Sequence, residues 1–187
     1  MNHIDLSSVL RQTVSCDLYS NLVTRPTGAA VRGQIEQMLR DTRERTLTVI
    51  DFSHVAMIDF SCADEVIAKL LLRYCADVPP HEAYFLFRGV TDEHWEAIEA
   101  VLERHGLALV IERGDDVQVE GVLPDAERRT WETMHRLGRV GPADLATALG
   151  TGASEVQLAL DELWRRRLVM KLDEGYVVVG GAGARRG

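Results

Sequence analysis

Apolar positions recur along this chain with two periods, and the period separates strands from helices. Short apolar runs rich in β-branched and aromatic residues predict buried strands at 47–51, 83–87 and 107–112. Apolar residues spaced three and four apart predict helices at 26–43, 62–75 and 92–104. One or two further strands are expected within 1–24. Strands that alternate with helices of this length predict an α/β sandwich with some parallel pairing.

The pattern changes after residue 112. Residues 113–124 combine charge, glycine and proline, which predicts a linker with room for a short extended piece. Three helices are expected next: Asp125 and Ser154 have the character of caps for the first and third, and Pro142 can open the second. Apolar runs around an Asp-Glu-Gly turn then predict a hairpin. The predicted organisation is a domain at 1–112, a linker at 113–124, a small domain at 125–180 and a disordered tail at 181–187.

The stretch 47–74 joins a core strand to an amphipathic helix through a polar turn. This turn reads Ile-Asp-Phe-Ser-Cys-Ala-Asp-Glu and covers residues 58–65. Ser61 and Asp64 have capping-box spacing, so Ser61 is expected at the N-cap of the helix. Asp64 and Glu65 then fall in the first helical turn, where carboxylates interact favourably with the helix dipole. A partly acidic turn at a helix start is the candidate working surface of the chain.

These residues resemble the centre of a STAS domain, the fold of anti-sigma factor antagonists. In that family an Asp-Ser-Ser/Thr-Gly motif follows an apolar strand, and a partner kinase phosphorylates the serine after the aspartate. Here Phe60 follows Asp59, and Cys62 stands in place of the glycine, so a carried-over phosphorylation would move to Ser61. The resemblance covers roughly residues 15–112. It implies a STAS-like mixed sheet with packed helices, and a kinase-type ATPase or an anti-sigma factor as the partner.

Two interpretations of the turn remain open from the sequence. In the first, the hydroxyl only caps the helix, and the carboxylates only complement the helix dipole. In the second, the turn binds a regulatory partner, and phosphorylation of Ser61 would add negative charge beside existing acids and disfavour binding. An exposed Phe60 would anchor such an interface, and a buried one would pack on the sheet. The expected partner-binding residues are Asp59, Phe60, Ser61, Cys62, Asp64 and Glu65.

Charge and cysteine usage narrow the environment and the partner. The formal charge of −8 lies in the first part of the chain, because ten basic residues face nine acidic ones from Asp125 onward. An acidic first domain disfavours phosphate backbones and anionic membranes and suits a protein with a basic face. Three cysteines without metal-type spacing indicate free thiols. The chain has no apolar run of membrane-spanning length and no secretory signal at its start, so a cytoplasmic location is expected.

The order helix, helix, helix, hairpin in 125–180 resembles a winged helix-turn-helix, which implies a possible DNA-binding function. The outward positions of the expected third helix, however, include Glu155, Asp161 and Glu162, which would repel phosphate. A basic cluster at the helix end and wing could contact a DNA backbone, or it could complement the helix dipole. The candidate DNA-binding residues are Gln157, Arg165, Arg166, Arg167 and Lys171.

Catalytic chemistry has little support in the sequence. Ser61, His54 and Asp59 could supply a nucleophile, a base and an orienting acid, but no glycine-framed elbow surrounds the serine. There is no phosphate loop and no metal-type cluster, so no cofactor or metal is expected. The leading hypothesis is a non-enzymatic regulatory protein that binds a signalling partner through 59–65. A DNA-binding transcriptional regulator is the alternative, and a serine-dependent enzyme comes third.

Overall fold

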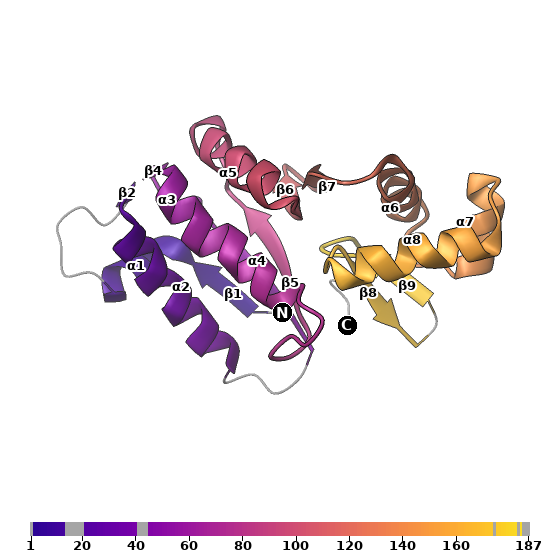
Figure 1. Cartoon of the computed structure of the whole chain (residues 1–187), viewed down its shortest axis with the longest axis horizontal. Coiled ribbons are helices and arrows are strands. Elements are labelled where there is room, and N and C mark those ends of the chain that lie inside the picture. The colour runs from indigo at the N-terminus through magenta and orange to yellow at the C-terminus, as the bar shows by residue number, and fades with distance from the viewer. Residues whose placement is uncertain (1, 14–20, 41–44, 174, 183, 185–187) are drawn as a thin grey trace.

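A mixed five-stranded sheet forms the centre of the computed structural model, which describes residues 2–13, 21–40, 45–173, 175–182 and 184 (Figure 1). The strand order is β1-β3-β5-β6-β7. The first three pairings are parallel, and β7 runs antiparallel to β6. The predicted α/β class with partly parallel pairing is therefore confirmed. The strand bounds are β1 Asn2–Asp5, β3 Thr46–Asp51, β5 Ala83–Arg88, β6 Ala108–Arg113 and β7 Asp116–Gly121.

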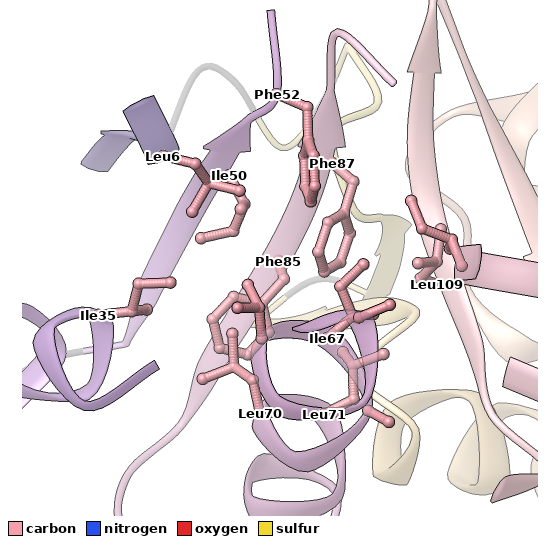
Figure 2. Close-up of a cluster of buried hydrophobic side chains, with 14 of the residues drawn as sticks. Leu6, Ile35, Ile50, Phe52, Ile67, Leu70, Leu71, Phe85, Phe87 and Leu109 are labelled. Carbon is pink, nitrogen blue, oxygen red and sulfur yellow. The ribbon is translucent and has the colours of Figure 1, made fainter. Parts of the chain in front are cut away.

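Helices from the first half of the chain cover one face of this sheet. Alternate strand residues such as Ile50, Phe85 and Leu109 point into a core that also contains Ile35 and Ile67 from the helices (Figure 2). Strand β2 pairs in parallel with β4 at the edge of this layer. The bounds are α1 Leu6–Thr13, β2 Asn21–Leu22, α2 Arg25–Arg40, β4 Met57–Ile58, α3 Phe60–Ala63, a π-helical turn η1 Asp64–Ala68, α4 Lys69–Tyr74 and α5 Asp92–His105.

The C-terminal part of the chain covers the other face. The remaining strand residues, among them Val49, Tyr84 and Val110, share a continuous apolar core with Trp131 and Leu163 from this part. Strands β3, β5 and β6 are therefore buried on both faces. The apolar run at 47–50 predicted this for β3. We call 125–180 the C-terminal module. Its elements are α6 Asp125–Leu137, α7 Pro142–Leu149, α8 Ala153–Arg165, β8 Val169–Leu172 and β9 Gly175–Val178.

Several local expectations differ from the structure. The segment expected as a linker, 113–124, contains β7, because its alternating valines Val117 and Val119 reach the core shared with the C-terminal module. The predicted helix at 62–75 begins earlier, at Phe60, and contains the π-helical turn η1. Helix α2 ends at Arg40, and the end predicted near residue 43 lies outside the described residues, as do Cys16 and most of the tail beyond residue 182.

The predicted helix caps also need correction. Asp125 and Ser154 lie inside α6 and α8, whose N-cap positions are Pro124 and Gly152. Gly106 ends α5 in the left-handed conformation, with a φ of 62°.

Within the part of the chain that the structure describes, no helix combines the length and the apolarity needed to cross a membrane.

Candidate functional site

The turn between β4 and α3 is held in place by one carboxylate. Asp59 is the N-cap of α3, and its Oδ1 accepts hydrogen bonds from Cys62 N at 2.7 Å and from Ser61 Oγ at 2.9 Å. Its Oδ2 accepts a third bond, from Thr24 N at 3.1 Å. Partial burial would raise the pKa of Asp59, but the two backbone amides and the hydroxyl outweigh it and lower that pKa. The helix start is therefore fixed to the segment that precedes α2.

Ser61 is not the cap that its spacing predicted. It occupies the second position of α3, and its hydroxyl donates to the actual cap, Asp59. Asp59 is the N-cap because its carboxylate can accept hydrogen bonds from the helix amide and from the Ser61 hydroxyl at the same time. The Ser61 side chain remains partly exposed. Phosphorylation there would remove the hydroxyl proton from this bond and place a dianion beside a carboxylate.

Two apolar side chains stand out at this turn. Phe60 is 37% exposed and Met57 is 47% exposed. Nearby residues in the sequence, Ile58 and Cys62, are buried in the core between the sheet and the N-terminal helices. The guanidinium of Arg104, on α5, lies 5.5 Å from the centre of the Phe60 ring. This contact is within cation–π range and leaves the ring 37% exposed. Phe60 thus has the exposed disposition that one of the two sequence interpretations required. We call residues 57–61 the corner.

The two following acids do not lie on the surface. Asp64 is 6% exposed and Glu65 is 2% exposed. Arg25 Nη1 donates to both, to Asp64 Oδ2 at 2.8 Å and to Glu65 Oε1 at 2.9 Å. His105 Nε2 lies 2.7 Å from Asp64 Oδ1, and Lys69 donates to Glu65. Both carboxylates are therefore neutralised within the chain, and they contribute little negative charge to the outer surface.

The pKa values of these acids follow from their partners. Burial would raise the pKa of Asp64, but Arg25 and His105 more than compensate, and the pKa is lowered. Burial likewise opposes ionisation of Glu65, whose pKa is nevertheless lowered by Lys69, Arg25 and a more distant Arg32. The acids are therefore ionised at neutral pH. Their role here is to hold α2 against the start of α3 and α4.

A third buried acid extends this network along the same two helices. Glu36, in α2, is buried; Arg32 Nη1 donates to its Oε1 at 2.7 Å, and Arg73 Nη1 lies 3.1 Å from its Oε2. Arg32 also donates to Glu65 at 3.4 Å, which joins the two groups of charges. The sequence contained a signal for part of this arrangement, because Arg32 and Glu36 are four residues apart on one helix. The pairings between helices carried no such signal.

Cys62 is wholly buried and has a structural contact. Its thiol donates to Thr24 O at 2.9 Å. Burial, helped by the neighbouring Asp59, raises its pKa to about 12, so the thiol stays protonated and is a poor nucleophile. Of the six residues expected to contact a partner, only Asp59, Phe60 and Ser61 reach the surface. The accessible part of the expected site is therefore smaller and less acidic than the sequence suggested.

The arginines expected at a DNA interface instead hold the C-terminal module on the sheet domain. Arg167 is 7% exposed, and its Nε donates to Tyr74 O at 3.0 Å. Arg166 Nη1 donates to Val122 O at 3.1 Å. Arg165 is exposed, but its Nη2 donates to Glu162 at 2.6 Å. The basic cluster is thus largely engaged within the chain.

The other two candidate DNA-binding residues lie farther out on the module. Gln157 donates to Asp161 at 2.8 Å on the exposed face of α8. Lys171 is exposed on β8, with its amine 5.9 Å from the ring of Tyr176. These two side chains do not form a continuous basic surface with Arg166 and Arg167, because the arginines face the sheet domain.

The arrangement gives no support to catalysis at Ser61. His54 is exposed in the loop before β4, and no contact among the described residues joins it to Ser61. Over the same described residues, no group of three His, Cys, Asp or Glu side chains is placed to hold a metal ion.

The chain matches none of the protein-family models with which it was compared, and none of the curated proteins.

Proposed function

We propose that this chain is a non-catalytic regulatory protein of the cytoplasm, related to STAS-like anti-sigma factor antagonists, that binds a signalling protein through the corner. One observation carries the proposal: Phe60 and Met57 expose apolar surface at a helix start whose backbone is fixed by Asp59. An aromatic side chain on a rigid support loses little conformational entropy on binding, which suits an interface anchor. The nearby buried ion pairs contribute to that rigidity.

The resemblance of 15–112 to STAS domains supports a kinase-type ATPase or an anti-sigma factor as the partner. Ser61 is the phosphoacceptor in this proposal. Ser61 is partly exposed and follows Phe60 directly, so a phosphate on it would lie at the edge of the apolar contact. Removing water from the phosphate in an apolar interface would cost free energy, and the phosphate would also repel Asp59. Phosphorylation therefore acts as an off-switch for binding.

The C-terminal module resembles a winged helix in its order of elements, and we assign it a supporting role. It buries the second face of the sheet, and the contacts of Arg166 and Arg167 fix it there. These contacts remove cations from any outward-facing groove. They therefore do not favour the alternative of a DNA-binding regulator.

Titration calorimetry with purified candidate partners tests the proposal. Each kinase-type ATPase and anti-sigma factor encoded in the same genome is titrated with the full chain and its variants. We expect Phe60→Ala and Ser61→Glu each to weaken binding about tenfold or more, as for a central interface residue. The controls Leu158→Ala, which also truncates an exposed large apolar side chain, and Ser154→Glu, which repeats the charge change, lie on α8 and should leave the affinity unchanged.

Two results would overturn the proposal. One is a partner that binds wild type, Phe60→Ala and Ser61→Glu with equal affinity, because the corner would then lie outside the interface. The other is the absence of binding to every candidate of both partner classes.

A further inference from the structure

The charged residues of α2, α3, η1 and α4 are sorted by depth. On these elements every acid is buried, namely Glu36, Asp64 and Glu65. The bases are half-exposed or exposed, apart from Arg32, which is partly covered. The outer surface of these helices is therefore cationic, on a chain whose formal charge is −8. We call the bases together the basic ridge; they are Arg25, Arg32, Arg40, Lys69 and Arg73.

The buried acids orient the bases and leave donors that point outward. Arg25 uses Nη1 for both of its bonds, so its Nε and Nη2 have no partner among the described residues. Arg73 contacts Glu36 through Nη1 only and is also half-exposed. Guanidinium groups that are fixed at one edge lose less side-chain entropy when the free edges meet a carboxylate. The basic ridge is thus prepared to bind acceptors from outside the chain.

The basic ridge is continuous with the corner. Arg25 contacts Asp64, one helical turn after Phe60, and Thr24 is bonded directly to Asp59. Arg104, on α5, lies 5.5 Å from the centre of the Phe60 ring. The exposed aromatic ring therefore has a cation against it, Arg104, and the basic ridge begins one helical turn away at Arg25.

Apolar side chains on the same helices favour a protein over a nucleic acid as the bound molecule. Met38 on α2 and Leu72 on α4 are exposed large apolar residues, and a sugar–phosphate backbone has nothing to cover them. The adjacent helix α5 also restricts the length of any polyanion. It exposes acidic side chains that would repel a strand extending beyond the ridge, at Glu93, Glu96, Glu99 and Glu103.

We propose that the basic ridge binds a short acidic segment of the protein partner, while Phe60 takes an apolar side chain from the same partner. This inference rests on the proposed partner-binding function and adds the charge of the partner. It reverses the expectation from the sequence, which was a partner with a basic face. Carboxylates of the segment pair with the outward edges of Arg25, Lys69 and Arg73.

Nuclear magnetic resonance of the isotope-labelled full chain tests this charge preference. The probes are a short glutamate-rich peptide with two leucines, the same peptide with lysine in place of glutamate, and a single-stranded oligonucleotide of equal negative charge. We expect only the acidic peptide to shift backbone amides of α2 and α4. Replacing Arg40, Lys69 and Arg73 together by glutamine should weaken that binding about tenfold.

The glutamine variant is designed to keep the fold. Glu65 retains Arg25 and Arg32, and Glu36 retains Arg32, so each buried acid still has a cation. A charge-matched control replaces three exposed bases of the C-terminal module, Arg129, Arg136 and Lys171, by glutamine and should bind like wild type. Thermal melting of both variants checks that they remain folded.

Each remaining outcome counts against the inference. It is overturned if the acidic peptide does not bind, if the two variants lose affinity equally, or if the lysine peptide or the oligonucleotide binds as tightly. Its failure is distinct from failure of the proposed function. A natural partner that is lost in Phe60→Ala but retained in the ridge variant would support the corner and refute the ridge.

Discussion

Arg167 provides the sharpest test of how the C-terminal module is attached. We expect Arg167→Ala to lower the free energy of unfolding by about 2–4 kcal/mol. The bond from Nε to Tyr74 O, at 3.0 Å, crosses from the module to α4 and involves a charged donor, which contributes roughly 1.5–3 kcal/mol. The guanidinium carbon also lies 5.8 Å from the ring centre of Tyr84 and 5.3 Å from that of Trp164, which adds about 0.5–2 kcal/mol.

The backbone at this position supplies an internal comparison. Arg167 has a φ of 61°, in the left-handed region that costs most residues about 1–2 kcal/mol. Glycine relieves this strain but has greater entropy in the unfolded chain. We therefore expect Arg167→Gly to be about 0.5–1 kcal/mol more stable than Arg167→Ala. Arg165→Ala, which removes only an exposed pair with Glu162, should change stability by less than about 0.5 kcal/mol.

Urea unfolding followed by both tryptophan fluorescence and circular dichroism measures these differences. The two probes should report one transition, because the module and the sheet share a continuous apolar core. A loss below about 0.5 kcal/mol in Arg167→Ala would refute the assigned contacts. Two separate transitions, with Arg167→Ala shifting only that of the C-terminal module, would show that the module unfolds independently of the sheet despite the shared apolar core.

Two further predictions concern the contact between α2 and the following helices. Gly28→Ala should destabilise the fold by about 1–3 kcal/mol in urea unfolding, because the added Cβ would lie 2.9 Å from Cys62 Cα, whereas Gly33→Ala, with open space around it, should be neutral or stabilising. Folding lowers the pKa values of Asp64 and Glu65. The stability that these carboxylates contribute should therefore be complete above their pKa values in the unfolded chain, and it should be lost as the pH falls through their pKa values in the folded protein. Glu65→Gln should make the melting temperature fall less steeply between neutral and acidic pH. An unchanged dependence on pH would contradict the role given to the Glu65 carboxylate.

The period of apolar residues was sufficient for the class of the fold. The strand at 47–51 and the helix at 92–104 appeared within one residue of their predicted bounds, because each is specified by its own buried face. The π-helical turn η1 could not be foreseen. The backbone amide of Lys69 bonds to Asp64 O there, and the surrounding residues have an ordinary helical pattern in the sequence. Strand β7 was expected only as a short extended piece of a linker, because its glycine and charged flanks have the composition of a linker.

The sequence by itself determined the central strands and the long helices, which of their faces are apolar, and that an aromatic residue follows Asp59 at a helix start. Only the tertiary structure decided which charges are available to a partner. Asp64 and Glu65 look like surface residues in a local pattern, but Arg25, some 39 residues away along the chain, is bonded to Asp64 and covers both. Arg167 likewise looks like part of a basic end and is buried against Tyr74. A local pattern reports the preference of one element, whereas the burial of a charge depends on what other elements bring to it.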